Sequence, residues 1–383
     1  MEPIPARRPG AQDWATTGRS RLTNKGLISG GQAKSLAADG WGGLGIAHAK
    51  AIVTLTNRGT IEGGNATGVT RALGGTGIYN GGTIGTLSNS GTIQGGVGSS
   101  GAAAIGSAGG GLDTIANTGS IIGGIYIKNQ SVTITGGVPT TFGYLTGLSS
   151  SVGSIDIENG NLTFASGATS LNDSIVVNGG KGTVYNEGSL MVAAPLTITG
   201  GFDRTQAGEL DLDFAGVVAS EYGSLYVGGG VTLNGELNLD ATGGFAFTSG
   251  EAFDILGFKA NALTGNFDSL LLDGQPCTST VADTWTCGTT VFNEVIDQST
   301  GRISLDDVTV SSKTLLDVAV SGQRIDALAG SYRLDVDKAV PEPSTWALIA
   351  TGFLSLGGLG MRRRKRSRAA WTAVHAEGDE RLR

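Results

Sequence analysis

The stretch Leu55-Thr-Asn-Arg-Gly-Thr-Ile-Glu-Gly-Gly64 decides the fold of this chain, because close copies of it recur along the first third of the sequence. The shared pattern is an apolar residue, any residue, Asn, any residue, Gly, usually Thr or Ser, Ile, any residue and Gly-Gly. Four full copies occupy residues 22–31, 55–64, 87–96 and 115–124, and weaker copies begin at Ile78 and Val184. The full copies begin 28 to 33 residues apart, a period typical of solenoid proteins.

Each position of the repeat has a mechanical interpretation. Asn-x-Gly is a turn sequence, because both residues adopt positive φ at low cost. The Ile begins a strand and faces inward, and the closing Gly-Gly turns the chain again. One coil cannot bury its own apolar face, whereas stacked coils can, with Ile and Leu in interior ladders and Asn amides hydrogen-bonded along a column. The sequence therefore predicts a right-handed parallel β-solenoid, and the alternative is a Gly-rich meander of antiparallel hairpins.

Composition supports an all-β fold with many turns. Gly accounts for 66 of 383 residues, more than twice its average share of roughly 7%. Glycine costs about 1 kcal/mol in a helix interior relative to Ala, which disfavours a helical protein. Collagen is excluded, since there are 8 Pro and no Gly at every third position. Ordinary disorder is disfavoured by the 39% of hydrophobic residues.

Charge and cysteine content narrow the setting. Residues 35–340 hold 12 Lys and Arg against 27 Asp and Glu, so we expect no nucleic-acid partner, which would need a basic face. Two cysteines, Cys277 and Cys287, would close one surface loop in an oxidising compartment, and two separate reduced thiols are the alternative. Two thiols cannot complete a zinc site, and we expect neither a metal nor a cofactor.

The residue pattern changes after about residue 150. Period-two strands with Asn and Gly turns run through residues 154–177, and the block 221–239 continues this alternation. Larger aromatics then enter in residues 245–258. Over about fifty residues this part resembles the C-terminal ends of autotransporter-type passenger β-helices, which implies terminal coils followed by a capping subdomain.

The end of the chain has three consecutive parts. Val340-Pro-Glu-Pro-Ser-Thr-Trp346 is stiff and extended, an apolar run follows to Met361, and a basic cluster ends at Arg368. As a helix, residues 346–361 would span roughly 24 Å, short of a hydrocarbon core of about 30 Å. We therefore predict a short membrane anchor with a basic stop on the cytoplasmic side.

These three parts in this order resemble the PEP-CTERM sorting signal of exported bacterial proteins. The resemblance implies an exosortase partner in the membrane, removal of the anchor, and release or attachment at the cell surface. The implied processing motif is Pro341, Glu342 and Pro343. The implied membrane contacts are made by Trp346, Leu348, Ile349, Phe353, Leu354, Leu356 and Leu359, and the basic stop consists of Arg362, Arg363, Arg364, Lys365 and Arg366.

The two ends of the chain depart from that family. Residues 1–9 contain no apolar segment of a signal peptide, so we expect a truncated or misassigned start. A tail of residues 369–383 follows the basic cluster. The predicted regions are an irregular N-terminus (1–20), solenoid repeats (21–200), a terminal solenoid and capping subdomain (201–310), a linker (311–339), the sorting signal (340–368) and the tail (369–383).

Candidate catalytic residues are sparse. Asp211 with Asp213, and Asp156 with Glu158, are two residues apart and so share one face of a strand. Such pairs suit cation binding or general acid and base work, and equally suit a solvated outer face. Asp306 and Asp307 are adjacent and would point to opposite faces of a strand.

Two functions remain. The first is an exported, non-enzymatic protein of the cell surface or extracellular matrix, anchored transiently in the inner membrane, whose polar faces bind extracellular polysaccharide or neighbouring molecules. The alternative is a carbohydrate-active β-helix enzyme, either a lyase or a hydrolase. A groove that combines acids, a basic residue and exposed aromatics on one face would favour the enzyme, whereas evenly distributed carboxylates would favour the first function.

Overall fold

The computed structural model describes residues 20–34, 39–68, 71–99 and 102–311, which belong to one compact unit of residues 1–313. This part is built of β-strands and turns, with three short 3-10 helices, η1 (Leu148–Ser150), η2 (Asn178–Gly180) and η3 (Ala219–Glu221). Within these ranges no helix has the length and apolar character needed to cross a membrane. The predicted sorting signal and its anchor lie outside the described residues.

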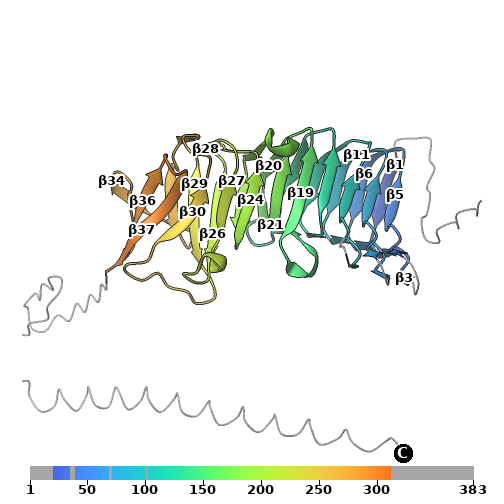
Figure 1. Ribbon diagram of the computed structural model, residues 1–383, viewed down its shortest axis with the longest axis horizontal. Helices are drawn as coiled ribbons and strands as arrows, with labels where there is room; N and C mark the ends of the chain where they lie inside the picture. The colour runs from blue at the N-terminus through green and yellow to red at the C-terminus, as the bar shows by residue number, and fades with distance from the viewer. Residues whose placement is uncertain (1–19, 35–38, 69–70, 100–101, 312–383) are drawn as a thin grey trace, which may run out of the picture. The chain divides into compact units, whose positions relative to one another are not determined.

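The chain winds through three strand positions in each coil, and each position builds one face (Figure 1). Face A consists of β1 (Ser20–Asn24), β6 (Ala51–Asn57), β11 (Thr83–Asn89), β14 (Leu112–Asn117), β17 (Val132–Thr135), β20 (Leu162–Ser166), β22 (Thr183–Asn186), β25 (Gly201–Arg204), β28 (Val231–Leu233) and β31 (Leu263–Gly265). Face B consists of β2 (Leu27–Ser29), β7 (Thr60–Glu62), β12 (Thr92–Gln94), β15 (Ser120–Ile122), β18 (Gly143–Thr146), the first half of β21 (Ala168–Val177), β23 (Ser189–Val192), β26 (Glu209–Phe214), β29 (Glu236–Ala241) and β32 (Ser269–Leu272). Face C consists of β5 (Ile46–His48), β10 (Ile78–Asn80), β13 (Ile105–Ser107), β16 (Ile125–Lys128), β19 (Gly153–Glu158), the second half of β21, β24 (Pro195–Thr199), β27 (Ser224–Val227) and β30 (Phe253–Gly257).

Strands of successive coils pair in parallel along all three faces, which is the arrangement of a β-solenoid. On face A, Leu55 is in register with Leu87 and Leu87 with Ile115. These three side chains are completely buried, and similar apolar ladders run inside faces B and C. The predicted interior ladders are confirmed, and parallel pairing excludes the antiparallel meander for this part of the chain. The weaker repeat at Ile78 begins β10 on face C, whereas the four full copies begin on face A.

The predicted asparagine column is also confirmed. At the corner between faces A and B, Asn24, Asn57, Asn89 and Asn117 are buried one above another. The Nδ2 of each of the first three donates to the Oδ1 of the next at 2.8 Å. Each of these amides also donates to a backbone carbonyl of the next coil, so the buried Nδ2 groups of Asn24, Asn57 and Asn89 have partners.

The glycine of Asn-x-Gly is required for a different reason from the predicted one. Gly59, Gly91 and Gly119 are not among the described residues with positive φ, so the prediction that these turns need that conformation is wrong. A Cβ at Gly91 would instead overlap the carbonyl oxygen of Gly59, and a Cβ at Gly119 that of Gly91. The coils stack backbone against backbone at this turn, where only glycine fits.

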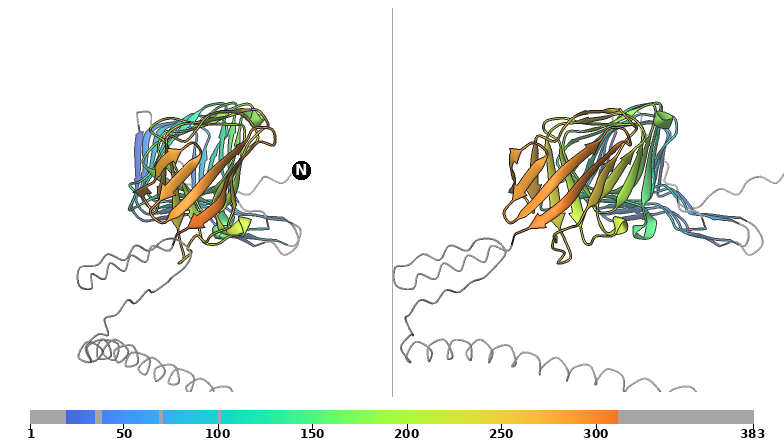
Figure 2. Two further views of the ribbon diagram at one scale, coloured as in Figure 1. Left: turned by 90° about the vertical axis from the view of Figure 1, so that its left-hand side faces the viewer. Right: turned by 60° about the vertical axis from the view of Figure 1, so that its left-hand side comes forward.

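The closing Gly-Gly leads into a flap rather than a simple turn. Two short parallel pairs, β3 (Ala33–Lys34) with β8 (Ala66–Thr67) and β4 (Gly40–Trp41) with β9 (Ala72–Leu73), project from the N-terminal coils (Figure 2). At the base of the flap the N–H of Gly43 donates to Gly31 at 2.7 Å, Gly64 to Gly43 at 2.8 Å, and Gly75 to Gly64 at 2.8 Å. Segments therefore cross in direct backbone contact, which no side chain would permit.

Antiparallel strands cap the C-terminal end of the solenoid. They are β33 (Gln275–Pro276), β34 (Thr278–Val281), β35 (Thr284–Cys287), β36 (Thr290–Asp297) and β37 (Arg302–Val310). β37 pairs antiparallel with β30 and so extends the sheet of face C across the end of the coil (Figure 2). Beneath the cap, aromatic rings pack together, with centroid distances of 5.0 Å for both Phe214–Phe253 and Phe247–Phe292.

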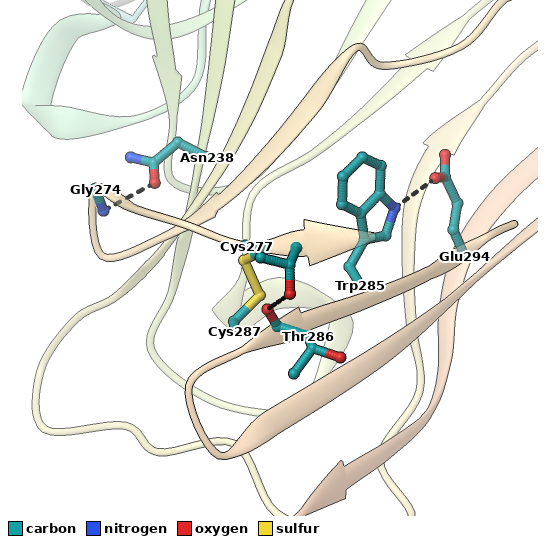
Figure 3. Close-up of a disulfide and its surroundings, with 8 residues drawn as sticks. Asn238, Gly274, Cys277, Trp285, Thr286, Cys287 and Glu294 are labelled. Atoms are coloured by element: carbon teal, nitrogen blue, oxygen red, sulfur yellow. Dashed lines mark hydrogen bonds between the residues drawn. A yellow bond between two sulfur atoms is a disulfide. The ribbon is translucent and has the colours of Figure 1, made fainter. Parts of the chain in front are cut away.

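A disulfide joins Cys277 and Cys287, one of the two arrangements that the sequence left open (Figure 3). The bond closes the β34–β35 hairpin, a short loop for which a contribution of roughly 2 to 3 kcal/mol to stability is typical. Nearby, Trp285 Nε1 donates to Glu294 at 3.0 Å, and the N–H of Gly274 donates to Asn238 Oδ1 at 3.1 Å. These bonds tie the cap to itself and to the last coils.

Candidate functional site

A groove of about 610 Å³ crosses face C where the last coils meet the cap. Strands β24, β27 and β30 form its floor, and the turn between β36 and β37 forms a wall. Its principal polar and aromatic residues are Thr197, Ser224, Tyr226, Asp254, Asp297 and Arg302. The groove exists because β37 returns antiparallel to β30 and brings the cap turn beside the solenoid face.

Tyr226 presents an aromatic ring to this groove. It occupies the outward position of β27, between the buried Leu225 and Val227, and 59% of its surface is exposed. Its register partner on β30 is Gly257. A Cβ at Gly257 would lie 2.8 Å from Tyr226 Cδ2, so the ring rests over the space that this glycine leaves open. The ring is thus supported on its inner side, and the rest of it faces solvent.

An ion pair separates the groove from a second hollow. Arg302 Nη1 lies 3.0 Å from Asp254 Oδ1, and both side chains are substantially exposed. They also line the second hollow of about 400 Å³, together with Asp306 and Asp307. The prediction that these two adjacent aspartates point to opposite faces is wrong, because Asp307 has a φ of 48° and the strand is locally irregular.

Asp297 is the remaining carboxylate of the groove. The Ser299 and Thr300 hydroxyls donate to it at 2.6 Å each, and their backbone N–H groups add further bonds. Hydrogen bonds from Ser299 and Thr300 hold the pKa of Asp297 well below its usual range. This carboxyl therefore stays ionised near neutral pH and cannot serve there as a general acid.

Several carboxyls with raised pKa values lie together on face B. As the spacing predicts, Asp211 and Asp213 share the outer side of β26 on face B, and Glu209 lies on the same side. Burial raises the pKa of Glu209 to about 7, and the negative charge of Asp211 contributes to the same shift as the next-largest cause. Burial and the facing charge of Asp240 raise the pKa of Asp213 to about 6. Asp211 itself is 6% exposed, and its Oδ2 accepts a bond from Ser189 at 2.7 Å.

A buried arginine lies beside these carboxyls. Arg204 takes the place of asparagine in the corner column, in register with Asn186. Its Nη2 donates to the carbonyls of Gly208 and Glu236, as the asparagine amides donate to carbonyls in other coils. Burial lowers the pKa of Arg204 to about 10, and the neighbouring acids oppose that shift. Its arrangement is structural, because the guanidinium is fully buried and bonded to backbone.

The other predicted pair is on the outer side of face C, in β19. Glu158 is exposed and lies 3.1 Å from Lys128 Nζ of the preceding coil, while Asp156 is half-buried. This ion pair links neighbouring coils on a solvated surface. In the described part of the chain, no group of three or more His, Cys, Asp and Glu side chains is arranged to hold a metal ion.

The composition and the protonation behaviour of the groove point in different directions. It combines acids, a basic residue and an exposed aromatic on one face, the combination expected of the enzyme. However, its aspartates are ion-paired or held ionised, whereas Glu209 and Asp213, two outward-facing carboxyls with pKa values raised to about 7 and about 6, belong to face B. The groove therefore presents an ion pair, a hydrogen-bonded carboxylate and a supported aromatic ring side by side.

Sequence reasoning missed Tyr226, Asp254 and Arg302 as members of one site. A local signal existed for Tyr226, since an aromatic alternates there with two inward apolar residues. The pairing of Arg302 with Asp254 depends on the antiparallel return of β37, which no local pattern contains.

Comparison with known families identifies a sorting motif in the chain. Residues 339–365 match the PEP-CTERM protein-sorting motif, and no curated protein matches the sequence. The match includes Pro341, Glu342 and Pro343 and confirms the resemblance seen in the sequence. It implies export and processing by an exosortase, a membrane enzyme. The chain therefore carries a PEP-CTERM sorting signal, which marks it as an exported protein and an exosortase substrate.

Proposed function

We propose that this chain is a non-enzymatic protein of the cell surface or extracellular matrix that binds polysaccharide with the outer faces of a right-handed solenoid. The observation that carries the proposal is the open groove at Tyr226, whose carboxylates are ion-paired or held ionised. A second support is the column of Thr54, Thr86, Thr114 and Thr133 along face A, which offers repeated hydroxyls for weak adhesive contacts. In this proposal the terminal coils and the cap correspond to the C-terminal end of an autotransporter-type passenger β-helix. Residues 346–361 would form a temporary transmembrane helix.

An enzyme acting on polysaccharide is the second candidate, and face B favours it. Glu209 and Asp211 are adjacent carboxyls, and the pKa of Glu209 is raised to about 7 by burial and by its neighbour. Two neighbouring carboxyls, one of which has a raised pKa, are the kind of pair that general acid and base catalysis uses. The near-complete burial of Asp211 argues against it, because a substrate would have to reach that side chain.

Turnover measurements separate the two candidates. We expect the purified chain to release no oligosaccharides from neutral or anionic polysaccharides, with or without the change Glu209→Gln. Reducing-end and unsaturated-product assays give the readout. Product formation by the unaltered chain, abolished by Glu209→Gln but not by the exposed-site change Glu158→Gln, would establish the enzyme and refute the non-enzymatic proposal.

Sorting has a separate test in the exporting host. Replacing Pro341, Glu342 and Pro343 by Ala should leave an uncleaved form in the inner membrane, because the exosortase would lose its recognition motif. Immunoblots of membrane and secreted fractions measure the distribution. The change Pro276→Ala, within the cap, controls for loss of a proline elsewhere. Unchanged processing and secretion of the triple variant would contradict the assignment of the motif.

A further inference from the structure

We infer that the groove at Tyr226 binds a polysaccharide chain that carries no acidic groups. This inference rests on the proposed function and names the site and the chemical class of its ligand. The groove and the adjoining hollow share Asp254 and Arg302 and so form two compartments on either side of one ion pair. Two adjoining compartments suit neighbouring units of a linear chain.

The aromatic platform supplies the apolar part of the recognition. A sugar ring has one face of C–H groups, and a flat aromatic ring that is supported from behind can pack against it. Tyr226 meets this requirement, because its ring lies over Gly257 and is 59% exposed. Tyr126, further along face C, is 45% exposed but does not line either compartment.

The polar lining supplies hydrogen bonds to sugar hydroxyls. Thr197, Ser224 and Thr300 contribute hydroxyls, and the carboxylate oxygens of Asp254 and Asp297 can accept hydrogen bonds. Hydroxyls both donate and accept, so a ligand rich in hydroxyl groups matches this lining. A purely apolar ligand would displace water from the groove and leave these polar groups without hydrogen-bond partners.

Charge selects among polysaccharides. The two compartments are lined by Asp254, Asp297, Asp306 and Asp307 against one arginine, Arg302, which is already paired with Asp254. A uronate, sulfate or phosphate group would meet uncompensated negative charge at close range and lose its water of hydration. Neutral and amine-bearing sugars avoid this repulsion.

The experiment measures binding of the full chain, in detergent, to β-1,4-linked hexasaccharides of glucose, glucosamine and glucuronate by isothermal titration calorimetry. We expect glucose and glucosamine hexamers to bind, and the glucuronate hexamer to bind at least roughly tenfold more weakly. The change Tyr226→Ala should lower the affinity for the glucose hexamer by roughly tenfold, because it removes the stacking ring. Tyr126→Ala, a matched exposed tyrosine on the same face, should leave affinity unchanged.

The outcomes separate this inference from the proposed function. Preference for glucuronate, equal losses in both tyrosine variants, or no binding of any hexamer would overturn the groove assignment. Retention of the chain by the extracellular polysaccharide of its host, unaffected by Tyr226→Ala, would overturn the groove but leave a polysaccharide-binding function in place. Failure of that retention would refute the proposed function itself.

Discussion

Replacing Gly91 by Ala is expected to destabilise the solenoid by about 3 kcal/mol, near the upper end of what overpacking usually costs. The added Cβ would overlap the carbonyl oxygen of Gly59 in the preceding coil, and the atoms around it are backbone rather than a flexible side chain. The coil must shift or separate, which also strains the Asn57–Asn89 hydrogen bond at the same corner. Denaturant unfolding followed by circular dichroism measures the loss.

Gly26→Ala is the matched control for this prediction. Gly26 occupies the same position of the same motif, but a Cβ there would have no atom within 4 Å, because no described coil precedes it. We expect its effect to stay within about 0.5 kcal/mol. Equal losses in the two variants would mean that the glycine is needed for its backbone conformation, and the explanation by backbone stacking would be wrong.

These glycines show how far the sequence predicts the fold. The repeat predicts which residues face inward. A buried ladder needs the same residue type at the same position of each coil, and such positions recur visibly in the sequence. Leu55, Leu87 and Ile115 follow that rule, and so does the asparagine column. Parallel stacking was therefore predictable from a local pattern. The reason for Gly59 and Gly91 was not, because it depends on which carbonyl lies above each turn.

The flap and Arg204 mark a second limit. Gly43 and Gly64 are hydrogen-bonded although they lie in segments separated in sequence. The Gly-Gly pattern alone predicts a turn, because it contains no sign of this contact. Arg204 replaces asparagine in the corner column, and a charged residue at a buried position contradicts the repeat pattern. Its guanidinium reaches two backbone carbonyls, a solution that depends on the local path of the coil.

The sorting signal and the groove also differ in how far a local sequence pattern can predict them. A sorting signal is read as a linear string, so the order of its three parts sufficed to predict the match at residues 339–365. The groove needs Tyr226 from the solenoid and Arg302 from the cap, which are brought together by the antiparallel return of β37. Spacing in the sequence identified pairs of acids as candidates, whereas the open site combines side chains of face C with side chains of the cap.

The change Asp173→Asn is expected to stabilise the chain at pH 8 and to have little effect near pH 4. Asp173 faces inward from β21 at the corner between faces B and C, in register with Gly153, and is completely buried. Burial raises the pKa of Asp173 from 3.8 to about 7, and the nearby backbone N–H of Gly153 offsets part of this effect. The folded state therefore holds a proton that the unfolded chain releases between these two values.

The sign of the pH dependence follows from that proton. Between about pH 4 and pH 7 the folded state binds more protons at this site than the unfolded state, so stability falls as pH rises. Below about pH 4 the site is protonated in both states and contributes no difference. Above about pH 7 the carboxylate is ionised while buried, and the accumulated cost is about 4 kcal/mol, an order-of-magnitude figure. Asparagine has nearly the same shape and cannot ionise, so it escapes this cost.

Thermal unfolding of both chains at pH 4, 6 and 8 tests the prediction. The difference in Tm between Asp173→Asn and the unaltered chain should be near zero at pH 4 and grow in favour of the variant at pH 6 and again at pH 8. Glu209 and Asp213 also have raised pKa values, but both chains contain them, so the difference isolates residue 173. Parallel Tm profiles would show that the Asp173 carboxylate is solvated or paired in the folded protein, and the inward placement of this side chain would then be incorrect.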